Sequence, residues 1–276
     1  MGVLLAVAGT PGLRAQTDHL PAAPALGSPT VTWSLHGLEL GFCIDFLMDS
    51  VVATKQIHKT ARDYLGLPAR EFGRLNPALA GLIERRPEYG AWIPSTICFL
   101  AADSLMVGGR VNTDRDPAKR QMAGFWGVAA RPPTDPSVDS ILVVRALFTN
   151  NHRVSRATET KGLEAATVKE SLGMVPERED QRYETRIERA DIRWDGHLAG
   201  AAPDSGESRT WTLAVRGRRN DMWTAVVRIW PRHQQTMVGS LLIQGKGDLA
   251  AALKGSPIRM QTSAFWSGVG TLEFYR

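Results

Sequence analysis

The chain has 276 residues, of which 43% are hydrophobic and 22% are charged. This composition is ordinary for a globular protein and excludes a disordered or collagen-like chain. Thirty-three basic and 28 acidic residues give a net charge of +5, which permits weak attraction to anionic surfaces but is too dilute to predict a nucleic-acid-binding protein. The densest positive stretch, "RGRRND" at 216–221, lies between two strand-like runs and is typical of a hairpin loop.

The N-terminal residues 1–15 read "MGVLLAVAGTPGLRA". A short apolar run is followed by the helix breakers Pro11 and Gly12 and then by Ala15, after which a signal peptidase could cut. This pattern predicts a secretory signal peptide, although no Lys or Arg precedes the apolar run. A disordered tail or a buried first strand is the alternative. We expect an extracytoplasmic protein, either periplasmic or secreted.

The proline-rich residues 16–29 are typical of an extended linker. The linker precedes a single β-rich domain, residues 30–276, with a helical insert at 52–90. No apolar run in the chain approaches the roughly 18 residues that a membrane-spanning helix needs. We therefore expect no membrane span.

The only two cysteines, Cys43 and Cys98, each lie in an apolar, strand-like run. In an oxidising compartment two such thiols without a third partner are expected to pair. The alternative is two separate buried thiols in a cytosolic protein. We predict a structural disulfide that ties the first strand to the strand after the helical insert.

The first ordered segment, Thr30 to Met48, alternates apolar and polar residues and predicts strands with a kink at Gly37. In the insert, apolar residues recur every three or four positions, and Pro68 and Pro77 suit the first turns of new helices. The segment from Asn150 to Leu172 predicts one or two further helices.

Further strands are predicted where β-branched and aromatic residues are bounded by turn-forming residues. Short polar turns between neighbouring strands favour antiparallel pairing, so the predicted fold is mainly β with a helical insert (α+β), an antiparallel β-sandwich or barrel. The predicted strands are Ser95 to Leu100, Ser104 to Val111, Gln121 to Ala130, Ser140 to Phe148, Arg182 to Trp194, Arg209 to Val215, Met222 to Trp230, Met237 to Gln244 and Gly270 to Tyr275.

One stretch, residues 60–94, resembles a LysM module. The matching residues are Ala61, Tyr64, Leu75, Asn76, Pro77, Gly90, Ile93 and Pro94. The resemblance implies a strand pair around a groove for N-acetylglucosamine glycans and makes an envelope glycan one possible ligand. Asn-Pro before small residues is also a common helix start, which is the alternative interpretation.

A second motif follows an apolar strand near the C-terminus. Gly245, Gly247 and Ala250 form G-x-G-x-x-A, a pattern that cradles a pyrophosphate when a helix follows. Too little chain remains for the further β-α units of a dinucleotide fold. We therefore interpret the stretch as a glycine turn, with Asp248 capping a short helix and Gly255 ending it, and we expect no cofactor.

The remaining site candidates are Asp195 and His197 in "ADIRWDGHL". In an extended chain these side chains share one face, as a pair of metal ligands or an acid and a base would. Asp-Gly also favours a turn, and no further motif completes a site, so we expect no metal. His233 is the one other residue that could join them.

The strand-rich half contains Trp194, Trp211, Trp223, Trp230 and Trp266. Tryptophans in strands fill a core or line an apolar cavity. Without a reaction-specific motif, we expect an exported, non-enzymatic binding or structural protein of the cell envelope, with an apolar small molecule or a glycan as its ligand. The alternative is a secreted enzyme of unknown class, most plausibly a hydrolase, which would need titratable groups converging in one pocket.

Overall fold

The computed structural model describes residues 27–72, 77–111, 121–133, 141–167, 169–173, 180–187, 189–205, 208–261, 264–266 and 268–276. The predicted signal peptide (1–15) and most of the predicted linker lie outside these ranges. No helix among the described residues is both long and apolar enough to cross a membrane.

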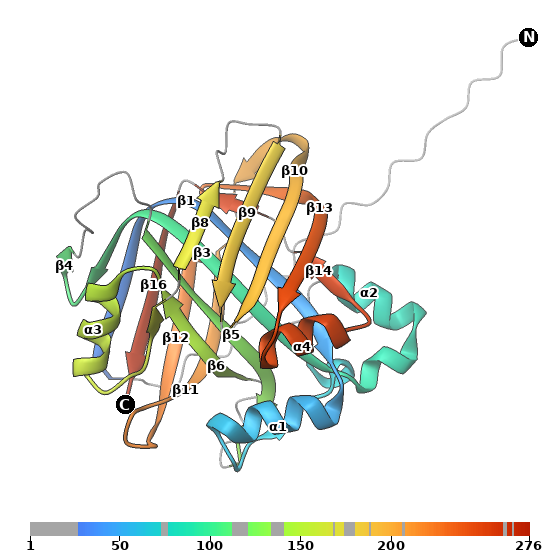
Figure 1. Cartoon of the computed structure of the whole chain (residues 1–276), viewed down its shortest axis with the longest axis horizontal. Coiled ribbons are helices and arrows are strands. Elements are labelled where there is room, and N and C mark those ends of the chain that lie inside the picture. Colours follow the sequence, from blue (N-terminus) through green and yellow to red (C-terminus); the bar gives the residue numbers. More distant parts are fainter. Residues whose placement is uncertain are drawn as a thin grey trace, which may run out of the picture.

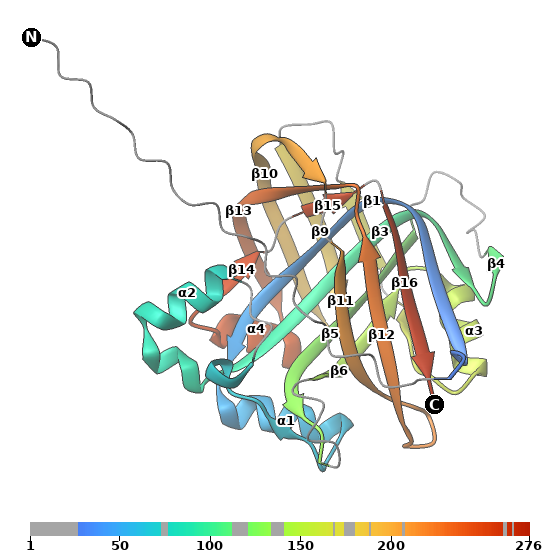
Figure 2. The same cartoon turned by 180° about the vertical axis from the view of Figure 1, so that it is seen from behind.

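Seven strands close into a β-barrel (Figures 1 and 2). Around the barrel the order is β3, β5, β6, β11, β12, β16 and β1, and β1 pairs again with β3. All of these pairs are antiparallel except β6 with β11, which is parallel. The bounds are β1 (Val31–Met48), β3 (Ile93–Val107), β5 (Gln121–Arg131), β6 (Ile141–Thr149), β11 (Arg209–Arg216), β12 (Met222–Trp230) and β16 (Gly268–Tyr275). The predicted mainly β fold is confirmed, and the barrel is the form that it takes.

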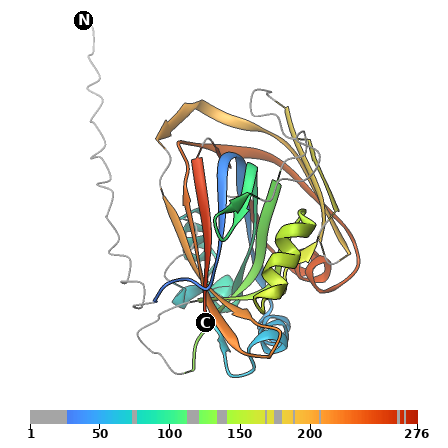
Figure 3. The same cartoon turned by 90° about the vertical axis from the view of Figure 1, so that its left-hand side faces the viewer.

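A second group of strands extends from β1 and forms a layer beside the barrel strands (Figure 3). It consists of β15 (Ala264–Trp266), β13 (His233–Gly245), β10 (Ala190–Ser205), β9 (Asp180–Ile187) and β8 (Lys169–Gly173). Four short strands complete the sheet: β2 (Leu65–Gly66), β4 (Arg110–Val111), β7 (Ala166–Thr167) and β14 (Arg259–Gln261).

The helices gather mainly at one end of the barrel, where α1, α2 and α4 lie near one another (Figure 1). Their bounds are α1 (Ser50–Thr60), η1 (Ala69–Glu71), α2 (Pro77–Arg85), η2 (Pro87–Ala91), α3 (His152–Thr160) and α4 (Asp248–Gly255). Asp49 caps α1, because its carboxylate accepts hydrogen bonds from the backbone N–H groups of Val51 and Val52. The predicted helical insert is therefore present, and α2 begins at Pro77 as its sequence indicates.

The LysM-like stretch, residues 60–94, does not form the strand pair of that module. Within its described part, β2 pairs with β5, and the strand that begins at Ile93 pairs with β1 and β5. Both partners lie outside the stretch. Residues 75 and 76, which carry the Leu-Asn of the resemblance, lie outside the described residues.

The barrel interior is apolar because alternate side chains of its strands point inward. Trp33 and Trp223 are buried, and the ring of Trp33 packs edge-on against Phe274 with centroids 5.6 Å apart. The indole N–H of Trp33 donates a hydrogen bond of 2.9 Å to the Thr158 hydroxyl of α3. Of the five tryptophans in the prediction, Trp223 fills the core and Trp211 packs against it, whereas Trp230 is 42% exposed.

The disulfide between Cys43 and Cys98 is present. The two residues lie directly opposite each other on β1 and β3, and both are buried. The bond therefore joins the first strand to the strand after the helical insert, as predicted. The kink at Gly37 is also present: this residue has φ +61°, and the β1–β16 register shifts beside it.

One expectation about local structure needs correction, and another is confirmed in part. The run from Arg182 to Trp194 is two strands, because the chain reverses near Arg189, which has φ 68°, and β9 pairs with β10. The segment from Asn150 to Leu172 holds one helix, α3, which Asn151 caps, followed by short strands.

Candidate functional site

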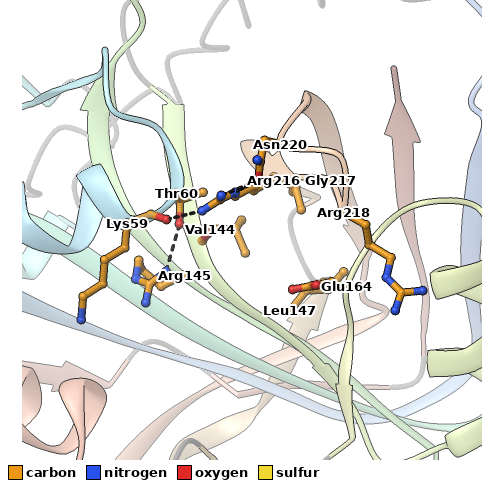
Figure 4. Close-up of a pocket in the computed structure, with 11 residues that line it drawn as sticks. Lys59, Thr60, Val144, Arg145, Leu147, Glu164, Arg216, Gly217, Arg218 and Asn220 are labelled. Carbon is orange, nitrogen blue, oxygen red and sulfur yellow. Dashed lines mark hydrogen bonds between the residues drawn. The ribbon is translucent and has the colours of Figure 1, made fainter.

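A polar pocket of about 330 Å³ opens where the end of α1 meets β6 and the β11–β12 hairpin (Figure 4). Its lining residues come from four parts of the sequence: Lys59, Thr60, Val144, Arg145, Leu147, Glu164, Val215, Arg216, Gly217, Arg218 and Asn220. Four of these are basic and one is acidic. The pocket therefore favours an anionic ligand.

The parallel pairing of β6 with β11 brings two arginines to the same pocket. Leu213 pairs with Leu142, and Ala214 pairs with Val143. Arg145 and Arg216 each follow these pairs along their strands, and both line the pocket. Arg145 is the extra residue where the β5–β6 register shifts, since Val144 pairs with Gly127 and Ala146 with Trp126.

Arg145 is held by neutral hydrogen-bond acceptors. Its Nε donates to Gln56 Oε1 at 3.1 Å, and its Nη1 donates to the Thr60 hydroxyl at 3.0 Å. The Thr60 hydroxyl in turn donates to the Val144 carbonyl at 3.1 Å. The guanidinium also lies 6.0 Å from the centre of the Trp126 ring. Its side chain is only 14% exposed, so the charge sits at a fixed position inside the pocket wall.

Arg216 reaches the same end of α1. Its Nη1 donates to the Lys59 carbonyl at 2.8 Å, and its Nε and Nη2 donate to Asn220 Oδ1. A guanidinium has five N–H donors, so two remain for a ligand. Asn220 adopts φ 62°, a conformation that Asn tolerates in tight turns. The hairpin loop thus positions the guanidinium.

The Lys59 side chain extends away from Arg216 (Figure 4), and its ammonium forms an ion pair with Asp248, the first residue of α4. The hydrogen bond from Lys59 holds the pKa of the Asp248 carboxyl below its ordinary value, against the opposing effect of partial burial. Asp248 also lies 4.0 Å from Arg145 Nη2. Lys59 therefore contributes its backbone carbonyl to the pocket, while its charge is balanced by Asp248.

Glu164 supplies the one carboxylate that lines the pocket, and it is directed toward the side where the two arginines lie (Figure 4). Arg218 points the other way. Within the described part of the chain, neither side chain has a hydrogen bond or an ion pair. Glu164 is therefore available to exchange a proton with a bound molecule.

The arrangement combines two fixed guanidinium groups with a carboxylate. Guanidinium groups bind carboxylates and phosphates through paired N–H donors, and they stabilise negative charge that develops on an oxygen atom. Among the described residues, no group of three or more His, Cys, Asp or Glu side chains is placed to hold a metal ion. The chemistry that the described residues can support is anion binding coupled to proton transfer.

The predicted candidates lie elsewhere. Asp195 and His197 are both on β10, which continues to Ser205. The chain is therefore extended at this point, as one of the two interpretations predicted, and the alternative of an Asp-Gly turn is wrong. Asp195 accepts a hydrogen bond of 2.6 Å from Arg193 and does not line the pocket. His197 pairs in the β10–β13 register with Val238, and His233 lies at the start of β13; the side chains of both histidines lie outside the described residues.

The glycine motif is a turn between β13 and α4. Gly245 and Gly247 have φ of 86° and 106°, and α4 begins at Asp248 and ends at Gly255. The interpretation of Asp248 as the helix cap is wrong, because Gly247 occupies that position and makes no side-chain hydrogen bond. The Asp248 carboxylate forms an ion pair instead with Lys59 of the neighbouring helix α1.

Sequence reasoning missed Arg145, Arg216 and Glu164. One available signal was the single charge at Arg145 within the apolar run "ILVVRALF", because a charge in a buried strand needs a partner or a function. The other was the basic loop at 216–221, which is a hairpin loop as predicted but also forms part of the pocket wall.

No protein-family model matches the chain, and no curated protein matches it. Several solved structures align with it along most of its length. An acetoacetate decarboxylase from Legionella pneumophila subsp. pneumophila str. Philadelphia 1 is 10% identical over 98% of this chain and 96% of its own, with a TM-score of 0.49. The enduracididine biosynthesis enzyme MppR, complexed with pyruvate, is 9% identical over 97% and 96%, with a TM-score of 0.46.

An acetoacetate decarboxylase-like enzyme from Sphingomonas wittichii RW1 is 8% identical over 88% of each chain, with a TM-score of 0.40. All three structures are enzymes. The expectation of a non-enzymatic binding or structural protein is corrected on this finding. At such low identity the likeness concerns the fold and assigns no reaction, substrate or catalytic residue to this chain.

Proposed function

We propose that this protein is an enzyme that binds a small carboxylate with a neighbouring carbonyl group and transfers a proton at the adjacent carbon. The observation that carries the proposal is the pair of guanidinium groups, Arg145 and Arg216, anchored at consecutive residues of the α1 end and facing a pocket that also holds Glu164. A pocket of about 330 Å³ suits a molecule of this size.

Each residue has a separate role. Arg145 and Arg216 hold the carboxylate and the carbonyl oxygen of the substrate. Glu164 takes a proton from the carbon next to the carbonyl. The electron pair of the broken C–H bond forms a carbon–carbon double bond, and the carbonyl electron pair moves onto oxygen. The guanidinium groups stabilise the resulting enolate, and the proton returns from Glu164 in the reverse step.

An amine mechanism through Lys59 is the principal competitor. A lysine that attacks a carbonyl must be uncharged and must reach the substrate. Here the Lys59 ammonium is engaged in an ion pair with Asp248, and its side chain extends away from Arg216 (Figure 4). The proposal therefore gives Lys59 no covalent role.

The test follows deuterium exchange in heavy water by NMR, with pyruvate, acetoacetate and 2-oxobutanoate as substrates of the full chain. We expect exchange at the carbon next to the carbonyl for at least one of them. Glu164→Gln should lower the exchange rate by ~100-fold or more with little change in affinity. Arg216→Gln should weaken binding about tenfold through the loss of charge-assisted hydrogen bonds.

Glu84→Gln is the matched control, because Glu84 is an exposed carboxylate outside the pocket. This variant should catalyse deuterium exchange of the substrate at the same rate as the unaltered protein. Unchanged exchange in the Glu164→Gln variant would overturn the role of that residue. Exchange with none of the three substrates would overturn the proposal. A pyruvate adduct trapped on Lys59 by borohydride would favour the amine mechanism instead.

A further inference from the structure

A second depression lies along the exposed face of α1, next to the pocket. It has a volume of about 760 Å³, and the basic residues that line it are Lys55, His58, Lys59, Arg62 and Arg216. We call it the α1 groove. Among the described residues that line it, none is Asp or Glu. Lys59 and Arg216 line both the pocket and the groove, so the two sites adjoin.

The charge of the groove is largely uncompensated. Within the described part of the chain, Lys55 and Arg62 have no hydrogen bond or ion pair through their side chains. The hydrogen-bond partners of Arg216 are Asn220 and the Lys59 carbonyl, and both are uncharged. Three cationic side chains therefore face one groove without an anionic partner, and the Lys59 charge is the one that is already balanced by Asp248.

Helix stability alone does not explain this arrangement. Cations in the last turn of a helix interact favourably with its dipole, which accounts for His58 and Lys59. Lys55 lies in the middle of α1, outside the last turn, and its spacing of four residues from Lys59 sets two like charges on one face, which destabilises a helix. A bound anion would remove that cost.

We propose that the α1 groove binds a phosphate group and that the substrate of the adjacent pocket carries this phosphate at the end remote from its carboxylate. The second part rests on the proposed function; the first does not. A phosphate group accepts hydrogen bonds on several oxygens and carries up to two negative charges, so it can engage several cations together. A single carboxylate needs only one guanidinium.

The experiment measures binding to the full chain at low ionic strength with three probes. Pyrophosphate reports on the groove, pyruvate reports on the pocket, and 3-phosphoglycerate carries both groups. The test variant is Lys55→Gln with Arg62→Gln. The matched control, Lys161→Gln with Arg85→Gln, removes the same charge from exposed positions outside both sites.

We expect the test variant to weaken pyrophosphate binding at least about tenfold, because charge-assisted hydrogen bonds are lost, and to leave pyruvate binding unchanged. The control should match the unaltered protein for all probes. Binding of 3-phosphoglycerate should weaken both in the test variant and in Arg216→Gln.

Equal pyrophosphate binding by the test variant and the control would overturn the groove proposal. If the unaltered protein binds pyrophosphate through the groove but does not bind pyruvate, the result counts against the proposed function and supports the groove proposal. If the test variant binds 3-phosphoglycerate as tightly as the unaltered protein does, the proposal that the substrate carries a phosphate into the groove is overturned. The last outcome concerns vesicles of phosphatidic acid. If the unaltered protein sediments with them, the test variant does not, and neither binds pyrophosphate, the groove binds a lipid surface and the proposal of a phosphate on a small substrate is overturned.

Discussion

Reduction of the Cys43–Cys98 disulfide should lower the free energy of unfolding by ~4 kcal/mol. The bond joins residues separated by 55 positions. For a loop of this length, the entropy that cross-linking removes from the unfolded chain corresponds to ~4 kcal/mol near room temperature. Because both sulfur atoms are buried, the thiols can remain in the core as small apolar groups after reduction. The main effect therefore falls on the unfolded state.

The assay is equilibrium unfolding in urea, with and without a reductant that stays active in denaturant. A loss of ~4 kcal/mol should lower the midpoint by roughly 1–2 M. The double variant Cys43→Ala with Cys98→Ala should unfold at a similarly low midpoint and should not respond to reductant. Equal midpoints for the oxidised and reduced protein would refute the loop-entropy argument. A reductant effect that persists in the double variant would show that the disulfide is not its source.

Three further predictions concern other parts of the chain. In a thermal melt, Gly124→Ala on β5 should destabilise the barrel by about 1–3 kcal/mol or more, because an added Cβ there meets the Cys98 carbonyl and the Phe148 ring. Gly255→Ala is the control, because its added Cβ meets nothing within 4 Å, and its melting temperature should be close to that of the unaltered protein. The lowered pKa of Asp248 means that the ion pair with Lys59 stabilises the protein above the ordinary value of 3.8 and that this contribution is lost as the pH falls through the lower folded value; Asp248→Asn should therefore show less acid-dependent loss than the unaltered protein, and identical curves would contradict this. We also predict export. When the protein is expressed from its own start in a bacterial host, its intact mass should show that residues 1–15 have been removed, and it should be found in an extracytoplasmic fraction. An intact chain in the cytoplasm would refute the signal peptide.

The described hairpins were predictable because their signals are local. In β12, Trp223 and Ala225 flank Thr224, and both are buried as the alternation indicates. In β11, Leu213 follows Thr212 and is also buried, although the alternation ends at Ala214, which is buried as well. The loop between these strands carries turn-forming residues. The disulfide was predictable for a similar reason, since two cysteines in apolar runs allow only one pairing.

The functional site was not predictable in this way. Its groups come from α1, β6, the segment after α3 and the β11–β12 hairpin. Asp195 and His197 were predicted as a site because they are close in sequence. Their strand, β10, belongs to the layer beside the barrel and not to the pocket. Conversely, Arg145 stood alone in its segment, and nothing near it in the sequence indicated Arg216.

The sequence by itself determined the local features: the strands, the helix starts, the kink at Gly37 and the cysteine pair. Only the tertiary structure decided that the strands close into a barrel and that β6 meets β11 in parallel. The physical reason is that alternation and turn chemistry act between near neighbours, whereas pairing between distant strands depends on the packing of the whole core. That contact places β6 beside β11, so that Arg145 and Arg216 line one pocket that exists only in the folded chain.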